Sequence, residues 1–272
     1  MRRDGRTGRP GVDAAVNSDA LYVYGVVGRD APVSLPVTGL DSLPVESLVC
    51  DELCALAHRC PPLPYDADDA GVVREWALTH DRVIEAALDL CGDVLPLRFN
   101  TIYPAGRTTA DEAVCSWLAG ERDALRASLD RVRGKREYSV QLWCHEDGLT
   151  ETLAETQPEL KARQQTVATL SPGKAYLRRQ ELKAAVRVSR AQAAAALAQQ
   201  LANELWACAS EVRAEPLPRA EERRLDNTAL VGRWACLATS EQAARIGERL
   251  EGFTNANKQV RFTGPWAPYS FV

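Results

Sequence analysis

EYSVQLWCH, residues 137–145, is the stretch that decides the fold of the second half of this 272-residue chain. Apolar side chains occupy every second position from Tyr138 to Cys144, and Ser139, Gln141 and Trp143 lie between them. This two-residue period is typical of a strand with one face towards a core. The sequence therefore predicts that a β-strand opens the second half.

A long helix is predicted after this strand. Ser171 and Pro172 are a good helix start, because Ser caps free backbone N–H groups and Pro fits the first turn. From Lys174 to Glu211 the sequence is rich in helix-forming residues and carries an apolar stripe on one face. Unbroken, this helix would be about 57 Å long. Two consecutive helices that meet near residues 182–189 fit the sequence equally well.

The remaining elements complete an α+β plan. Strands are predicted at about 212–217, 227–237 and 259–264, and a helix is predicted at 241–250. The resulting order is β-α-β-β-α-β, which is the split βαβ or ferredoxin-like arrangement of two helices on one face of an antiparallel sheet. We therefore expect a C-terminal ferredoxin-like domain at residues 135–272.

The sequence of the first half predicts a modified ferredoxin-like fold in which the first helix is missing. A segment at 1–18, rich in Gly, Arg and polar residues, is expected to be a flexible tail. The N-terminal domain is then expected at 19–134. Its predicted elements are a strand at 21–27, a hairpin from 47–50 and 53–58, a helix at 70–91, a strand at 94–99, and helices at 109–118 and 121–131.

The composition indicates an ordinary globular protein that stays in the cytoplasm. The formal net charge is −4 and the two signs of charge are interspersed, which argues against nucleic acid as a partner. No apolar run approaches the roughly 18 residues of a membrane span, and the N-terminus lacks the apolar middle of a secretory signal. In this reducing compartment we expect the 8 cysteines to be free thiols.

No residue pattern indicates catalysis or a cofactor. Cys50, Cys54, His58 and Cys60 form the densest group of potential metal ligands, but a structural zinc site takes two tight pairs and this spacing is irregular. We therefore expect neither a metal nor another cofactor. His80 lies near the apolar face of the predicted helix at 70–91, where a hydrogen-bonded structural histidine is commoner than a catalytic one.

The predicted strand and helix order is shared with RNA-binding RRM domains, which stack bases on aromatic side chains. Trp143 and Trp234 could supply such a platform. The basic-glycine-aromatic signature of those domains is absent and the chain is acidic, so packing in the core or against a partner is favoured for both tryptophans.

Three segments together resemble the gas vesicle protein family that contains GvpF and GvpL. They are VLPLRFNT at 94–101, SPGKAYL at 171–177 and TGPWAPYSFV at 263–272, and the opening strand LYVYG at 21–25 fits as well. Two positions depart from the family pattern. Asn100 stands where the family more often has Gly, and Ala267 where it more often has Pro. Asn tolerates a positive φ better than most residues, so we expect the turn at Asn100 to survive.

The resemblance implies a two-domain α+β protein that has no known catalytic activity and is needed for gas vesicle formation. It implies the small hydrophobic shell subunit (GvpA type) and other gas vesicle proteins as partners, and the gas vesicle as the location. Physically, such a protein would keep the shell subunit from associating wrongly by covering apolar surface or unpaired strand edges. It would thereby help to nucleate or build the vesicle.

The resembling segments supply the candidate interface or interdomain residues. We expect the aromatic C-terminal segment to pack at the domain junction, and Arg98 to form an interdomain ion pair or to contact the partner. The rival interpretation is a small-molecule-binding or enzymatic ferredoxin-like domain, which needs a pocket with converging polar groups. The candidates are Arg98, Asn100, Tyr176, Arg178, Trp266, Tyr269 and Phe271.

Overall fold

The computed structural model of the chain describes residues 19–145, 148, 162, 166, 172–219, 224–225 and 228–272. The chain divides into two compact units, between Arg136 and Glu137 and again between Pro265 and Trp266. The C-terminal segment Trp266–Val272 therefore belongs with the N-terminal unit, whereas the sequence prediction assigned it to the second domain. The expected tail at 1–18 lies outside the described residues.

The N-terminal unit contains an antiparallel sheet whose strands lie in the order β2-β3-β4-β1-β5, with β6 also paired to β1. Without the edge strand β2, the first strand lies between the third and fourth, as the split βαβ plan requires. In place of that plan's first helix, the chain forms β2 and the short 3₁₀ turn η1 (Leu40–Ser42). The strands are β1 (Ala20–Gly28), β2 (Ser34–Thr38), β3 (Pro44–Cys50), β4 (Leu53–Cys60), β5 (Leu95–Pro96) and β6 (Ile102–Pro104).

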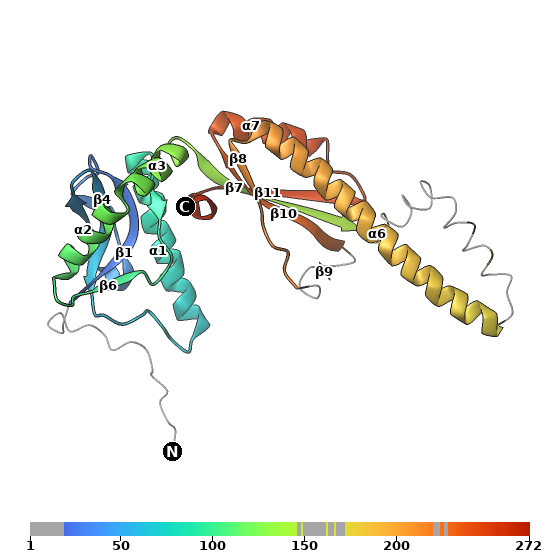
Figure 1. Ribbon diagram of the computed structural model, residues 1–272, viewed down its shortest axis with the longest axis horizontal. Coiled ribbons are helices and arrows are strands. Elements are labelled where there is room, and N and C mark those ends of the chain that lie inside the picture. The colour runs from blue at the N-terminus through green and yellow to red at the C-terminus, as the bar shows by residue number, and fades with distance from the viewer. Residues whose placement is uncertain are drawn as a thin grey trace, which may run out of the picture. The chain divides into compact units, whose positions relative to one another are not determined.

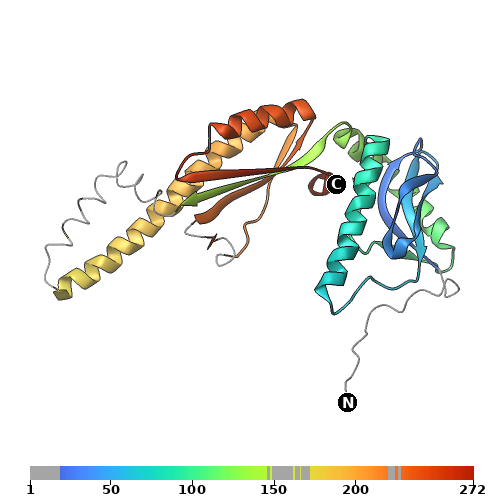
Figure 2. The ribbon, with the colours of Figure 1, turned by 180° about the vertical axis from the view of Figure 1, so that it is seen from behind.

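Helices cover both faces of this sheet, which explains why β1 is buried along almost its whole length. Helix α1 (Ala70–Cys91) packs on one face, and α2 (Ala110–Gly120) with α3 (Arg122–Val132) on the other (Figures 1 and 2). Thr109 caps α2 through a capping box with Glu112. Free helix N–H groups are satisfied in this way by local side chains.

The hairpin, the α1 helix and the two shorter helices are where the sequence predicted them, but the strand predicted at 94–99 is much shorter. Only Leu95 and Pro96 pair with β1 there, and pairing resumes at β6. The interruption is a turn in which Asn100 has φ 68°. A residue in this left-handed region cannot continue a ladder, so the chain leaves the edge of β1 and returns. The positive φ expected at Asn100 is confirmed.

The described part of the C-terminal unit has the predicted α+β order. Its sheet runs β11-β7-β10-β8, with the short β9 also paired to β10. Helices α6 and α7 pack on this sheet around one hydrophobic cluster. The elements are β7 (Arg136–His145), α6 (Pro172–Cys208), β8 (Glu211–Ala214), β9 (Arg224–Leu225), β10 (Thr228–Ala238), α7 (Ser240–Glu251) and β11 (Lys258–Trp266). The strand predicted at 212–217 is thus shorter, and β9 was not predicted.

Helix α6 is continuous over 37 residues, so the two-helix alternative does not apply. Its contacts with the hydrophobic cluster of the sheet begin at Ala193 and end at Cys208. The N-terminal part of α6 extends past the strands in both ribbon views (Figures 1 and 2). The predicted N-cap, Ser171, lies outside the described residues.

The two tryptophans considered as a stacking platform lie on opposite faces of the C-terminal sheet. Trp234 is buried among the helix-facing residues, whereas Trp143 belongs to the alternate positions of β7 that face away from the helices. A base cannot stack on both at once. The two tryptophans therefore do not form one stacking platform.

One expectation about the cysteines is wrong. Cys50 at the end of β3 and Cys115 in α2 form a disulfide, while the other six cysteines are free thiols. The hairpin brings Cys50 to the face that α2 covers, and this proximity cannot be seen from sequence positions 65 apart.

Candidate functional site

Two buried tyrosine–histidine pairs lie between the N-terminal sheet and α1. The Tyr22 hydroxyl lies 2.8 Å from His80 Nδ1, and the Tyr24 hydroxyl lies 2.9 Å from His58 Nδ1. All four side chains are almost completely inaccessible to solvent. The pairs meet because Tyr22 and Tyr24, two residues apart on β1, point to the same face of the sheet, the one that α1 covers.

The hydrogen-bond partners of His80 indicate where its ring carries a proton. His80 Nε2 donates to the Leu97 carbonyl at 3.1 Å, because a carbonyl oxygen only accepts. The Tyr22 hydroxyl, which accepts from the Asn100 backbone N–H (3.2 Å), lies against Nδ1. Burial lowers the pKa of His80 and so favours the neutral imidazole, whose Nδ1 accepts from that hydroxyl. Burial also raises the pKa of Tyr22 and of Tyr24.

The second pair continues as a chain of hydrogen bonds to the surface. The Leu40 N–H donates to the Tyr24 hydroxyl at 2.8 Å, and the same hydroxyl is hydrogen-bonded to His58 Nδ1. His58 Nε2 lies 3.2 Å from the Tyr65 hydroxyl, and this hydroxyl donates to Asp41 Oδ2 at 2.9 Å. This series of hydrogen bonds therefore runs from Tyr24 in the centre of the sheet to the Asp41 carboxylate at the surface.

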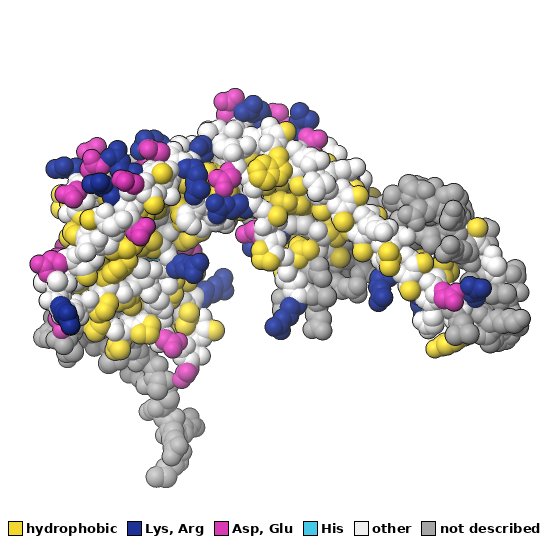
Figure 3. Space-filling view, in the orientation of Figure 1, with side chains coloured by type: hydrophobic (Ala, Val, Ile, Leu, Met, Phe, Trp, Pro, Cys, Tyr) yellow, Lys and Arg dark blue, Asp and Glu magenta, His cyan; other side chains and the backbone are white. Residues whose placement is uncertain are grey.

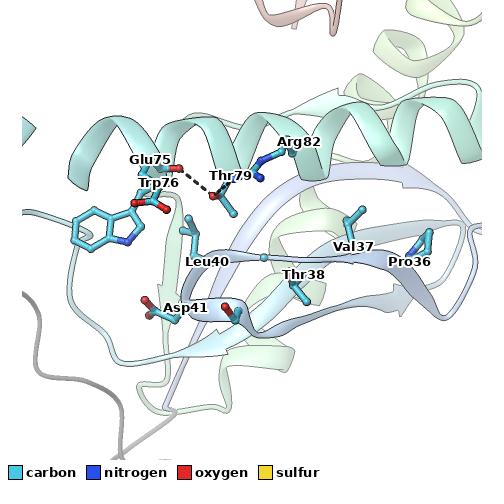
Figure 4. Close-up of a pocket in the computed structure, with 11 residues that line it drawn as sticks. Pro36, Val37, Thr38, Leu40, Asp41, Glu75, Trp76, Thr79 and Arg82 are labelled. Carbon is cyan, nitrogen blue, oxygen red and sulfur yellow. Dashed lines mark hydrogen bonds between the residues drawn. The ribbon is translucent and has the colours of Figure 1, made fainter. Parts of the chain in front are cut away.

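Asp41 lies at the rim of a groove between α1 and the segment formed by β2 and η1 (Figure 4). The groove has a volume of about 680 Å³. One wall is a single face of α1, and the other is the edge of the sheet. Its lining residues are Pro36, Val37, Thr38, Gly39, Leu40, Asp41, Ser42, Glu75, Trp76, Thr79 and Arg82.

Of the residues predicted from the sequence, Asn100 is part of the buried network. Its side chain clamps the backbone of Tyr65, because Asn100 Oδ1 accepts from the Tyr65 N–H (2.7 Å) and Nδ2 donates to the Tyr65 carbonyl (3.1 Å). With its backbone N–H on Tyr22, Asn100 joins both tyrosine–histidine pairs. A Gly at this position would keep the turn and lose the clamp.

Two more predicted residues, Tyr269 and Phe271, anchor the C-terminal segment within the N-terminal unit. Phe271 is fully buried, and its carbonyl accepts a hydrogen bond from Arg131. The Tyr269 hydroxyl donates to Asp81 Oδ1 at 2.8 Å, and its ring centroid lies 6.5 Å from that of His80. Burial first, and then the Asp81 carboxylate, raise the pKa of Tyr269.

The other predicted residues are not brought together. Arg98 is exposed in the turn before Asn100, and within the described residues it makes no ion pair. Trp266 is 47% exposed. Tyr176 and Arg178 lie on α6 in the other unit, where Tyr176 is 62% exposed and Arg178 pairs with Glu181 at 2.8 Å.

Metal-ligand geometry is not found in the part of the chain that the structure describes. Cys50 is in the disulfide, and Cys54 and Cys60 are buried thiols. Burial raises the pKa of Cys54, which opposes thiolate formation. Residues 19–145, 172–219 and 228–272 hold no group of three potential ligands, and none of the described helices has the apolar length to cross a membrane.

Sequence reasoning identified His80 as a hydrogen-bonded core histidine, which the structure confirms, but it missed the rest of the network. Tyr22 and Tyr24 are two residues apart on a predicted strand, and His58 lies on the next predicted hairpin. Polar aromatic side chains on a buried face require buried partners. That requirement was the available signal, although it could not say which residues would be the partners.

The whole of the described chain is similar to known gas vesicle proteins. Residues 20–272 match the family model of gas vesicle synthesis protein GvpL/GvpF. Gas vesicle protein L2 of Halobacterium salinarum is 30% identical over 261 residues, which cover 94% of this chain and 92% of that protein. Gas vesicle protein F of Dolichospermum flosaquae is 30% identical over 142 residues, covering 52% of this chain and 54% of its own.

Solved structures share the fold. The crystal structure of GvpF from Anabaena superposes with a TM-score of 0.73 at 21% identity, over 93% of this chain and 98% of that one. GvpF from Microcystis aeruginosa gives a TM-score of 0.66 at 20% identity, with the same coverage. The α+β fold expected from the sequence is confirmed, and the match of the family model over almost the entire chain shows that this protein belongs to the GvpL/GvpF family of gas vesicle synthesis proteins.

Proposed function

We propose that this protein binds the small hydrophobic shell subunit of the gas vesicle and other gas vesicle proteins, and helps to nucleate or build the vesicle without catalysing a reaction. Membership of the family supports the general role in gas vesicle synthesis. The step from that role to binding the shell subunit rests on the surface of the protein. It acts in the cytoplasm, at the vesicle.

The observation that carries this proposal is an exposed, uncharged face on α6. No charged residue occurs between Arg190 and Glu204, although every turn of this stretch exposes side chains. A helix face that only meets water normally carries charged and polar residues. Here the exposed positions are Ala191, Gln192, Ala195, Ala196, Gln199, Gln200 and Asn203.

An exposed aromatic side chain lies at the end of this face. Trp206 is 59% exposed, and Ala207 beside it is exposed too. In Figure 3 the surface over the middle of α6 is white and yellow, and charged side chains reappear towards the N-terminal end of the helix. Small apolar residues with amides and one large aromatic residue suit close packing against another protein's helix or apolar surface. The shell subunit offers such a surface.

The rival function, small-molecule binding, would use the groove of the N-terminal unit. This groove has converging polar side chains, which that function needs. The buried histidines do not line it, however, and the described hydrogen bonds already engage both of their ring nitrogens. The two buried histidines are therefore engaged in the core and do not act on a ligand in the groove.

Co-purification with the shell subunit of the same host tests the proposed function. The wild-type chain, tagged and co-expressed with that subunit, is expected to retain it through a salt wash. Ala196→Glu places an unpaired carboxylate on the α6 face and is expected to weaken retention at least about tenfold. Ala244→Glu is the matched control, because Ala244 is an exposed alanine on α7. Equal retention by both variants, or none by the wild type, would refute the proposal.

A further inference from the structure

The groove between α1 and the β2–η1 segment has two chemically different ends. Figure 4 shows Glu75, Trp76 and Asp41 at one end, and Arg82 with Pro36 and Val37 towards the other. Glu75 and Arg82 are separated by two turns of α1, or about 10 Å. The middle of the groove is lined by Thr79 and Leu40. Such a groove distinguishes the two ends of whatever lies in it.

The first end has the composition of a site for a cationic side chain. Two carboxylates, from Asp41 and Glu75, flank the indole of Trp76. Carboxylates form charge-assisted hydrogen bonds with ammonium and guanidinium groups, and indole is the best aromatic partner for a cation. Within the described residues, no Lys or Arg side chain pairs with Glu75.

The nearest cation on the same wall is held away from the carboxylates. Arg82 donates through Nη2 to the Thr79 hydroxyl at 2.8 Å and through Nε to the Leu78 carbonyl at 3.3 Å. The Thr79 hydroxyl in turn donates to the backbone carbonyl of Glu75 at 2.9 Å, not to its carboxylate. The positive charge of Arg82 is thus held at Leu78 and Thr79 and is not paired with the Glu75 carboxylate.

The core of the unit holds the acidic end in position. Asp41 and Ser42 have φ angles of 53° and 59°, which non-glycine residues rarely adopt. The Tyr65 hydroxyl bonds the Asp41 carboxylate, and the buried chain through His58 and Tyr24 fixes Tyr65 in turn. Tyr65 also packs edge-on against Trp76, with ring centroids 5.3 Å apart. Unfavourable turns that are fixed in this way are found at ligand sites.

We propose that this groove is a docking site for a segment of a partner gas vesicle protein that inserts a Lys or Arg side chain between Asp41, Glu75 and the indole of Trp76. The apolar residues next to that cation lie along Val37 and Leu40, and an acidic or polar residue meets Arg82. Charge complementarity selects the partner, because the free energy of binding depends on filling the negative end. The inference rests on the proposed function only in that the protein works by binding other proteins.

Overlapping synthetic peptides test this site. They cover the gas vesicle proteins of the same host, this chain included, and their affinity for the full-length protein is measured by fluorescence anisotropy. Peptides with a Lys or Arg beside apolar residues are expected to bind, and replacing that residue by Gln is expected to abolish binding. Glu75→Gln is expected to lower the affinity about tenfold or more, since a charge-assisted hydrogen bond is lost. Raising the salt concentration is expected to weaken binding as well.

Glu85→Gln is the matched control, because Glu85 is exposed on the same helix outside the groove. A second variant, Arg82→Gln, keeps the negative end and is expected to retain the preference for a cation. The inference is overturned if Glu75→Gln and Glu85→Gln bind alike, if peptides without a cation bind equally well, if only peptides of this chain bind, or if none binds. If the shell subunit co-purifies but Glu75→Gln does not change peptide affinity, the proposed function stands and the groove inference fails. If the shell subunit does not co-purify, the proposed function fails, whatever the peptide affinities are.

Discussion

The two units of this protein have similar strand orders but different cores. The N-terminal core contains two histidines and three tyrosines joined by hydrogen bonds, whereas the C-terminal cluster is almost entirely apolar, with Val140, Leu142 and Leu201 at its centre. Apolar burial stabilises a fold without fixing directions, while a buried hydrogen-bond network fixes particular atoms. The network therefore allows the N-terminal unit to hold the groove rim in one geometry, and the C-terminal unit presents a helix face that needs no such precision.

The largest expected effect concerns the C-terminal segment. Phe271→Ala removes a fully buried ring from the N-terminal unit and is expected to lower the free energy of unfolding of that unit by about 3–5 kcal/mol. Leu142→Ala is the counterpart in the apolar core, with an expected loss of about 2–5 kcal/mol confined to the C-terminal unit. Proteolysis in urea, with the fragments identified by mass spectrometry, reports each unit separately. A loss of stability in the C-terminal unit alone for Phe271→Ala would contradict the assignment of the segment.

The next effect tests whether the network stabilises the N-terminal core. Tyr22→Phe keeps the ring but leaves the Asn100 N–H and His80 Nδ1 without their partner. Leaving such groups unsatisfied is expected to cost about 1–3 kcal/mol. Urea denaturation measures the loss. The control is Tyr138→Phe in the C-terminal unit, where the ring stacks on Phe262. Among the residues that the structure describes, the Tyr138 hydroxyl has no hydrogen-bond partner, so little change is expected.

A smaller effect is expected on the pH dependence of stability, which should differ between the two units. Because burial lowers the pKa of His80 in the folded state, the unfolded chain binds the proton more readily. The stabilising contribution is fully present above the unfolded pKa of about 6.5, and it is lost as pH falls from there towards the folded value. Urea midpoints of the N-terminal unit are therefore expected to fall between pH 7.5 and 5.5 more than those of the C-terminal unit. Equal shifts in both units would contradict this account.

The smallest effect is expected on the exposed part of α6. Arg178 pairs with Glu181 in water, and both side chains are more than half exposed. Surface ion pairs of this kind contribute little, so Arg178→Ala is expected to change the free energy of unfolding by less than about 0.5 kcal/mol. A clear loss of shell-subunit retention with unchanged urea stability would instead make Arg178 a partner contact.

Local sequence patterns predicted most of the elements but not the contacts between them. Alternation identified β1 and β7, and helix propensity identified α6 over nearly its true length. The strand predicted at 94–99 is shortened to Leu95–Pro96, because the chain turns away from β1 before the left-handed residue Asn100. Strand β2 was not predicted, because Pro36 within it cannot donate to a strand ladder and such a proline is as typical of a loop as of an edge strand.

The candidate sites show the same limit. The resemblance selected Asn100, Tyr269 and Phe271, which lie in the N-terminal unit, but no pattern indicated that His58 and Asp41 would connect through Tyr65. Those contacts join residues from separate elements. They depend on the packing of α1 against the sheet, which is determined by many apolar residues together and not by any local motif.

Retention of the shell subunit by the full-length chain tests the central claim most directly. Co-expressed with the host's shell subunit and purified under native conditions, the wild type and Ala244→Glu are predicted to carry that subunit, and Ala196→Glu to lose most of it. A wild-type preparation free of the shell subunit, or identical amounts on all three proteins, would contradict the claim that the α6 face binds it.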